Sequence, residues 1–246
     1  MKPELIQALT SASNVAVLTG AGVSAESGIP TFRDAQTGLW SRFRPEDLAT
    51  PEAFERDPKT VWEWYAWRRE QLAEVDPNPG HAALAEMERH FEGVALITQN
   101  VDGLHQKAGS SQVIELHGNI RRSICHRTRK PISEAQLAEA SGVPPRSPHA
   151  PDGLARPDVV WFGEMLPARA LNDALAACST CEVFFSVGTS SLVEPAASLA
   201  FAAREAGALV VEVNPDATPL SRHADFVLRG KAGEILPQLL AALDAA

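Results

Sequence analysis

The chain has 246 residues, of which 45% are hydrophobic and 22% are charged, and its formal net charge is -9. These values are ordinary for a globular protein with one sizeable core, and the acidic balance argues against nucleic-acid binding, because phosphate contacts need a basic face. No apolar run is long enough to cross a bilayer, and the first residues lack the features of a signal or transit peptide. Three cysteines fit a reducing compartment without a disulfide framework, so we expect a cytoplasmic protein.

Four short apolar runs alternate with helical patterns along the chain. The runs are "NVAVLTG", "GVALITQN", "VFFSVGTS" and "ALVVEVNP", and their continuous apolarity predicts strands that are covered on both faces. The helical patterns fall at Pro79–His90, Leu171–Ala177, Ala196–Ala206 and Glu234–Leu243. We therefore expect a doubly wound, Rossmann-like α/β fold with a parallel sheet, whose ligand lies beyond the carboxyl ends of the strands.

Two segments interrupt this alternation. Residues from about 36 to 78 are rich in aromatic residues and arginine, and residues from about 121 to 156 are polar and proline-rich. We interpret both as insertions that form a second, smaller domain over 36–78 and 121–156. The Rossmann-like domain then comprises residues 1–35, 79–120 and 157–246.

The first predicted strand runs into the glycine-rich loop "TGAGVSAESGIPTFRD". Gly20 and Gly22 allow a tight turn and a close approach of the backbone to a pyrophosphate. A lone G-x-G is a weak signal, and the third glycine of the dehydrogenase fingerprint is absent at its usual spacing. The continuation "IPTFRD" is more specific, because ordinary Rossmann oxidoreductases lack it at this spacing.

Six linked motifs resemble those of the sirtuins, the NAD-dependent protein-lysine deacylases. They are, in the family's order, "GAGVSAESGIPTFRD", "TQNVDGLHQKAG", "ELHGNI", "RPDVVWFGE", "VGTSSLVEPAA" and "VEVNPDATPLS". The resemblance covers nearly the whole chain. It implies an enzyme that transfers an acyl group from lysine to NAD and releases nicotinamide, free lysine and 2′-O-acyl-ADP-ribose.

The resemblance implies three catalytic residues. His117 matches the general base, which activates a ribose hydroxyl, and an imidazole suits this role because its pKa lies near neutral pH. Asn100 and Asp102 match residues that hold the nicotinamide amide and the ribose; after a strand, such residues are also common turn formers.

The resemblance assigns the NAD-binding role to positions from all parts of the Rossmann-like domain. In this family Phe32 shields the reactive face after nicotinamide departs. The matching positions are Gly20, Ala21, Gly22, Ser24, Ala25, Ile29, Pro30, Phe32, Arg33, Gln99, Asn100, Val101, Asp102, Gly188, Thr189, Ser190, Asn214, Pro215, Asp216 and Ala232.

The segment "VVWFG" matches the part of the family that binds acylated lysine in peptides and proteins. Val160, Trp161, Phe162 and Gly163 would pair with the substrate peptide as an added strand and line the acyl-lysine tunnel. A buried strand has the same residue pattern, so this assignment depends on the resemblance. Glu194, where relatives have tyrosine or glutamine, would lie near the peptide groove, and an acid there could favour basic peptides.

The stretch "VWEWYAWRRE" contains three of the five tryptophans and the only tyrosine. On a helix, Tyr65 and Arg68 share one face at i, i+3. An amphipathic helix with a buried aromatic face would give the same pattern. Sirtuins that prefer succinyl, malonyl or glutaryl lysine carry a tyrosine and an arginine at this spacing, and Ala49 matches a small residue that widens the same pocket. The resemblance therefore implies a desuccinylase or demalonylase with weaker deacetylase activity.

The zinc module of the family is reduced here. Most sirtuins hold a structural zinc with two C-x-x-C pairs, whereas this chain has Cys125 and Thr128, then Ser147 and Ala150, at those places. Tetrahedral zinc needs four such ligands, so we predict that zinc is absent; a makeshift site from Cys125, His126 and His149 is the alternative. Cys178 and Cys181 lie elsewhere in the fold, and we expect them to be buried core residues.

Two other functions are compatible with the same motifs. One is a mono-ADP-ribosyltransferase or NAD glycohydrolase, and the other is a non-catalytic sensor of NAD or ADP-ribose. A sensor would not need Asn100, Asp102 and His117, which are all present. We further expect a monomer.

Overall fold

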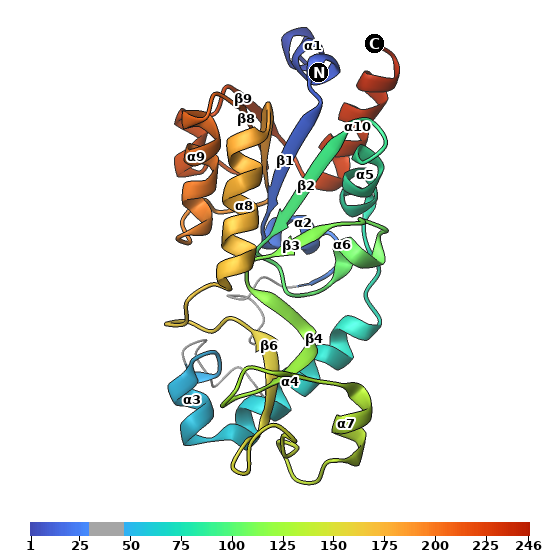
Figure 1. Cartoon of the computed structure of the whole chain (residues 1–246). Helices are drawn as coiled ribbons and strands as arrows, with labels where there is room; N and C mark the ends of the chain where they lie inside the picture. Colours follow the sequence, from blue (N-terminus) through green and yellow to red (C-terminus); the bar gives the residue numbers. More distant parts are fainter. Residues whose placement is uncertain (30–46) are drawn as a thin grey trace.

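The structure is a computed structural model that describes residues 1–29 and 47–246. Its larger part is a sheet of six parallel strands in the order β3-β2-β1-β7-β8-β9 (Figure 1). Their bounds are β1 (Asn14–Thr19), β2 (Gly93–Thr98), β3 (Val113–Glu115), β7 (Val183–Val187), β8 (Leu209–Asn214) and β9 (Phe226–Arg229). The four predicted strands are all present in the parallel sheet, which confirms the Rossmann-like fold.

The sheet is buried on both faces, as the continuous apolar runs predicted. In β1, Val15 and Val17 belong to one hydrophobic cluster, whereas Ala16 and Leu18 belong to another. Neighbouring residues of a strand point to opposite faces, so this division means that helices cover both sides.

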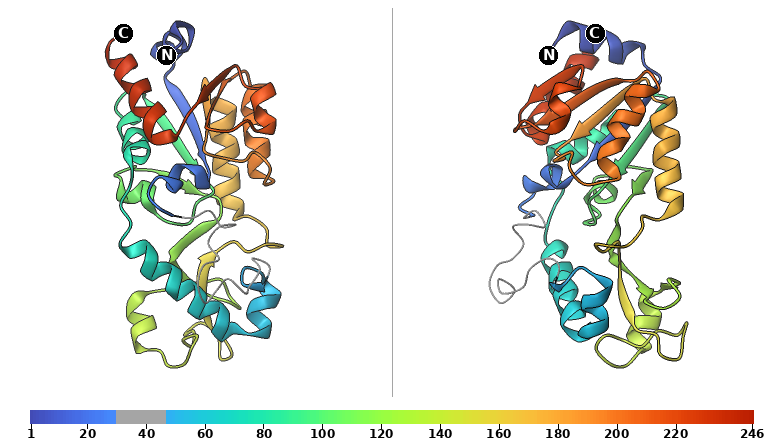
Figure 2. Two further views of the ribbon diagram at one scale, coloured as in Figure 1. Left: turned by 180° about the vertical axis from the view of Figure 1, so that it is seen from behind. Right: turned by 90° about the vertical axis from the view of Figure 1, so that its left-hand side faces the viewer.

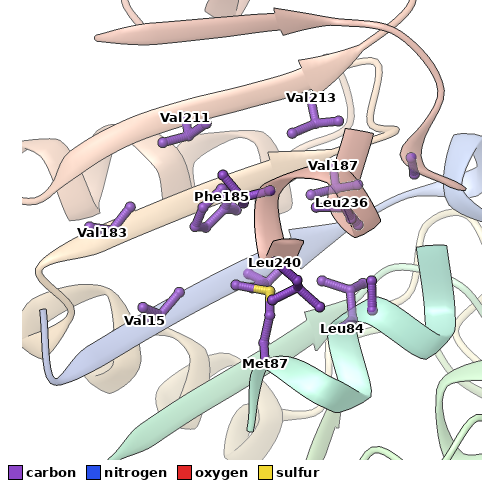
Figure 3. Close-up of a cluster of buried hydrophobic side chains, with 14 of the residues drawn as sticks. Val15, Leu84, Met87, Val183, Phe185, Val187, Val211, Val213, Leu236 and Leu240 are labelled. Carbon is purple, nitrogen blue, oxygen red and sulfur yellow. The ribbon is translucent and has the colours of Figure 1, made fainter. Parts of the chain in front are cut away.

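Two groups of helices cover the two faces of the sheet. The face of Val15 packs against α1 (Pro3–Ser11), α5 (Pro79–Met87) and α10 (Ala232–Asp244), and the other against α8 (Ala168–Thr180) and α9 (Leu199–Glu205). Figure 3 shows Phe185 of the sheet facing Leu240 of α10 and Met87 of α5. Short helices α2 (Ala21–Ala25) and α6 (Leu104–Lys107) and two 3-10 turns, Ala196–Ser198 and Pro219–Arg222, follow strands.

The smaller part contains an antiparallel sheet of three strands, in the order β5-β4-β6. Its elements are α3 (Pro51–Arg56), α4 (Pro58–Ala73), β4 (Gly118–Cys125), β5 (Pro131–Ile132), α7 (Glu134–Glu139) and β6 (Ala155–Val159). They lie together beyond the carboxyl ends of the large sheet, whereas both termini lie at its opposite end (Figures 1 and 2). The exact domain bounds remain a prediction.

Candidate active site

A cavity of about 1260 Å³ lies where the carboxyl ends of the large sheet face the smaller part. It is lined by most of the site residues predicted from the sequence: Gly20, Ala21, Gly22, Ser24, Ile29, Ala49, Tyr65, Arg68, Gln99, Asn100, Val101, Asp102, His117, Val160, Trp161, Phe162, Gly163, Gly188, Thr189, Ser190, Asn214 and Asp216. Ala25, Pro215 and Ala232 lie outside this lining. Pro30, Phe32 and Arg33 fall outside the described residues.

Glycines bring the loops after β1 and β7 into direct backbone contact. The Gly22 N–H donates to the Gly188 carbonyl at 2.8 Å. A Cβ at Gly22 would lie 2.7 Å from that carbonyl oxygen, and Gly188 has a positive φ of 60°. Only glycines permit this approach. The two loops can therefore lie in contact and together form one side of the cavity.

Asn100 and Asp102 are held by hydrogen bonds from the glycine loop. The Asn100 amide nitrogen donates to the Gly20 carbonyl at 3.0 Å and to Ser24 Oγ at 3.1 Å, while Ser24 Oγ donates to Asp102 Oδ2 at 2.8 Å. Since both Asn100 amide hydrogens are engaged, its carbonyl oxygen can serve as an acceptor toward the cavity. A ligand in the cavity therefore meets the oxygen of the Asn100 side-chain amide rather than its nitrogen.

Two buried histidines, His81 and His105, lie next to this hydrogen-bond network, and the sequence analysis did not single out either of them. His81 Nδ1 accepts the Asn78 N–H at 3.4 Å, so its protonated Nε2 faces Ser24 Oγ at 3.3 Å. His105 Nε2 lies 2.9 Å from Thr19 Oγ1, which joins the helix after β2 to the end of β1. Burial lowers the pKa of both, that of His105 to about 3, so both are neutral at pH 7.

His117 is oriented as a base by a backbone carbonyl. Its Nδ1 lies 2.9 Å from the Gln99 carbonyl oxygen, which can only accept, so Nδ1 carries the proton. The unprotonated nitrogen is then Nε2. Burial lowers the pKa of His117 despite the opposing effect of the Gln99 hydrogen bond. A neutral imidazole that lines the cavity can accept a proton from a bound hydroxyl group.

Helix α4 forms the wall of the cavity on the side of the smaller part. Tyr65 is 1% exposed, and its hydroxyl oxygen accepts the Trp161 Nε1–H at 2.9 Å. Arg68 follows on the same helix, with its guanidinium 5.0 Å from the ring centroid of Trp64. Both Tyr65 and Arg68 line the cavity, together with Ala49. The helix thus buries Val61, Trp64 and Leu72 in the core and also supplies Tyr65 and Arg68 to the pocket.

The segment Val160 to Gly163 is tied into the chain through its backbone N–H groups. The N–H of Val160 donates to His117, that of Phe162 to Ala49, and that of Trp161 to the Glu164 carboxylate. The Trp161 carbonyl in turn accepts the Glu164 N–H at 3.0 Å, so the segment is held by the chain on both sides of Trp161.

Comparisons with known proteins agree with this geometry. The Sir2 family profile matches residues 20–195. The chain belongs to the Sir2 family. It is 53% identical, over 89% of its length and 90% of the relative, to an NAD-dependent protein deacylase of Aquifex aeolicus.

Two solved structures of Sir2 homologues overlay on the whole chain. A complex with NAD has a TM-score of 0.89 at 45% identity and is covered to 94%. A variant in complex with 2′-O-acetyl ADP ribose has a TM-score of 0.88 at 46% identity and is covered to 97%. This sirtuin is therefore an NAD-dependent protein deacylase, and the glycine contacts and the oriented Asn100 carbonyl fit NAD as its cofactor.

The remnant of the zinc module does not fit a metal. Burial raises the pKa of the Cys125 thiol, but hydrogen bonds with Ser147 and Thr128 outweigh it and the net shift is downward. Ala150 packs against the same cluster. The donors are thus one thiol and two hydroxyls, which is not a zinc ligand set. Within residues 1–29 and 47–246, no three His, Cys, Asp or Glu side chains converge as ligands.

Each histidine of the alternative ligand set has one ring nitrogen engaged with the backbone. His126 Nδ1 accepts the Leu154 N–H at 2.8 Å, and His149 Nε2 lies 2.8 Å from the Pro131 carbonyl. Cys178 and Cys181 are buried in the core between the large sheet and α8, as expected.

Several lining residues had no signal in the sequence analysis. Leu72, Met165, Leu171, Asn172, Leu192 and Val193 are examples. They come from loops and helix ends whose positions depend on the tertiary fold. Glu194 lines the same cavity and accepts a hydrogen bond from Ser198 Oγ at 2.7 Å. In the part of the chain that the structure describes, no helix is long and apolar enough to cross a membrane.

Proposed function

We propose that this sirtuin removes succinyl and malonyl groups from lysine, with deacetylation as a weaker activity. The observation that supports the proposal is the shared position of Tyr65 and Arg68 on the wall of the cavity that His117 also lines. An acyl-lysine that reaches His117 would bring the far end of its acyl group to this wall.

The chemistry of the two side chains favours an acyl group that ends in a carboxylate. Burial raises the pKa of Tyr65 to about 12, so the phenol keeps its proton and can donate it. Burial lowers the pKa of Arg68, while Tyr65 and Asp102 raise it. The guanidinium nevertheless stays charged at neutral pH, and a buried cation is stabilised by an anionic ligand.

The size of the expected preference follows from charged hydrogen bonds. A guanidinium fork and a phenol donor could contribute about 1.5–3 kcal/mol of discrimination against a neutral acyl group. The same pocket would bind an acetyl group without these contacts. A preference of roughly 10-fold to 150-fold for succinyl over acetyl corresponds to this energy.

The remaining residues have roles that the network supports. NAD supplies the ribose to which the acyl group is transferred, with release of nicotinamide, as 2′-O-acyl-ADP-ribose. The Asn100 carbonyl would orient the carboxamide or a sugar hydroxyl, and Asp102 would hold the adjoining loop through Ser24. His117 would accept the proton of a ribose hydroxyl through Nε2. Val160, Trp161, Phe162 and Gly163 would bind the substrate peptide.

The decisive experiment compares one peptide carrying either acetyl or succinyl lysine. We expect the parent to favour succinyl, and Arg68→Met to lose about 10-fold or more of kcat/KM on succinyl while the acetyl reaction changes much less. A matched Lys59→Met variant, at the exposed start of the same helix, should behave like the parent. Faster turnover of acetyl by the parent would overturn the proposed preference.

We also infer the compartment, the partners and the metal content of the protein from its composition and its degenerate metal module. Free cysteines are compatible with the reducing cytoplasm. The net charge of -9 disfavours nucleic acid as a partner. We propose that the enzyme acts as a zinc-free monomer.

A further inference from the structure

An ion pair between buried Arg156 and partly buried Glu164 lies next to the acyl wall, and Glu164 also pairs with the exposed Arg129 at 3.0 Å. Arg156 of β6 is 3% exposed, and it forms a fork with Glu164, with Nη1–Oε1 at 2.7 Å and Nη2–Oε2 at 2.8 Å. Nη2 also donates to the Val159 carbonyl at 2.8 Å. A buried pair is costly to desolvate unless its geometry is good and its remaining groups are bonded. Because this pair is well bonded, it can hold neighbouring side chains and backbone groups in defined positions.

The neighbour that the pair fixes is Trp161. The Trp161 backbone N–H donates to Glu164 Oε2 at 2.9 Å, and the Arg156 guanidinium carbon lies 3.3 Å from the centroid of the Trp161 ring. Phe54 adds a tilted ring contact at 5.4 Å. One charged group therefore holds the backbone of Trp161 and the other stacks on its ring, so both the place and the plane of the indole are determined.

The indole in turn determines what the Tyr65 hydroxyl can do. An indole N–H can only donate, so the Tyr65 oxygen must accept in their 2.9 Å hydrogen bond. The phenol proton then remains for another acceptor, and Tyr65 lines the cavity. A carboxylate at the end of an acyl group is an acceptor of the required kind.

We propose that Arg156 and Glu164 are positioning residues for acyl selectivity, because they fix Trp161 and, through its indole N–H, make the Tyr65 hydroxyl a donor toward the acyl carboxylate. This inference rests on the proposed function of the acyl wall. It adds two specificity determinants: Arg156, which does not line the cavity, and Glu164, which lines it next to Trp161.

The contact between Trp161 and Tyr65 is tested by a double-mutant cycle. The readout is the ratio of kcat/KM for succinyl to that for acetyl on one peptide, in the parent, Trp161→Phe, Tyr65→Phe and the double variant. Trp161→Phe keeps an aromatic ring but removes the N–H. We expect Tyr65→Phe to lower the ratio about 10-fold, Trp161→Phe to lower it about 3-fold, and the double variant to match Tyr65→Phe alone.

Two outcomes of the cycle overturn different statements. In the first, the parent prefers succinyl and the double variant lowers the ratio by the product of the two single effects. That result would show that Trp161 does not act through the Tyr65 hydroxyl, and it would overturn this inference alone. A parent that prefers acetyl would overturn the proposed function and this inference with it.

The role of the ion pair is tested by Arg156→Lys, which keeps the charge but loses the fork. We expect a rise of about 3-fold or more in the KM for the succinyl peptide, while the KM for NAD stays within about 2-fold. The control is Arg127→Lys, because Arg127 forms an exposed ion pair with Asp152 in the same part of the fold. It should match the parent.

A second variant keeps this test decisive if Arg156→Lys folds poorly. Glu164→Gln preserves the size of the side chain and removes its charge, and we expect the same rise in the KM for the succinyl peptide. Unchanged acyl selectivity in a folded variant of either residue would overturn the positioning role. Equal rises in the KM values for peptide and NAD would overturn it too, because they would indicate a general structural defect.

Discussion

At the residue scale, the orientation of His117 has a measurable consequence. Its Nδ1–H donates to Gln99, and burial lowers its pKa below the ordinary value of 6.5. The base is neutral above its pKa, so kcat/KM should be constant near neutral pH and should fall as the pH decreases through a value below 6.5. A pH–rate profile measures this value. An apparent pKa above 7 for the essential base would contradict the assignment.

Substitution of the same residue separates binding from catalysis. His117→Tyr should lower turnover by about 100-fold or more, because general base catalysis is lost, whereas calorimetry should still detect NAD binding. His223→Asn, at an exposed position, provides the control. Turnover that survives in His117→Tyr would refute the role of His117.

The sequence could predict pairs of residues that are close along the chain, but not distant contacts. Tyr65 and Arg68 share a helix face, and the i, i+3 spacing predicts this directly. The hydrogen bond between Trp161 and Tyr65 joins positions 96 residues apart, and no local pattern encodes it. The same limit applies to Ser24 and His81, whose contact depends on how the glycine loop packs on α5.

At the element scale, Arg69 attaches helix α4 to strand β4. Its Nε donates to the Ile120 carbonyl at 2.5 Å, and Nη2 donates to the Arg122 carbonyl at 3.0 Å and to Ser123 Oγ at 3.1 Å. Arg69→Met leaves these acceptors without their donor, which should cost about 1–3 kcal/mol of unfolding free energy. Chemical denaturation measures the loss.

The matched control for this prediction is Arg89→Met. Arg89 lies in the turn after α5, is largely exposed and pairs with Glu86 near the end of that helix, so its removal should cost less than about 1 kcal/mol. Equal stabilities of the two variants would show that Arg69 is not a structural link.

Element prediction succeeded where apolar runs were long and failed where they were short. The four central strands were predicted because each is buried on both faces. Strands β3 and β9 were missed, since they have only 3 and 4 residues and lie at the edges of the sheet. The antiparallel sheet of the smaller part was also missed, because β4 mixes buried and exposed residues within a polar segment.

At the scale of the whole molecule, the buried histidines make stability depend on pH. Burial lowers the pKa of His105 to about 3 in the folded protein, whereas an unfolded histidine titrates near 6.5. Below about pH 6.5 the unfolded chain therefore binds the extra proton, and stability falls as the pH decreases toward 3 by about 1 kcal/mol per pH unit for His105.

Unfolding measured between pH 7.5 and about 5 tests this expectation, in a window where carboxylates contribute little. His105→Gln should reduce the slope of stability against pH, because it removes the group that binds a proton only on unfolding. A slope that is the same in the parent and His105→Gln would contradict the effect of burial.

The metal content of the purified protein is another property of the whole molecule. With Cys125, Thr128, Ser147 and Ala150 at the module, we expect no stoichiometric zinc and no change of Tm on addition of a chelator. Metal analysis by mass spectrometry checks the first statement. One equivalent of zinc per chain would show that other ligands replace the lost cysteines.

The most direct test of the account identifies the products formed from NAD and a succinyl-lysine peptide. If one cavity brings the ribose, the acyl group and His117 together, mass spectrometry should find nicotinamide, free-lysine peptide and succinyl-ADP-ribose in equal amounts. Free succinate with intact NAD, or ADP-ribose attached to peptide or protein, would contradict acyl transfer in this cavity.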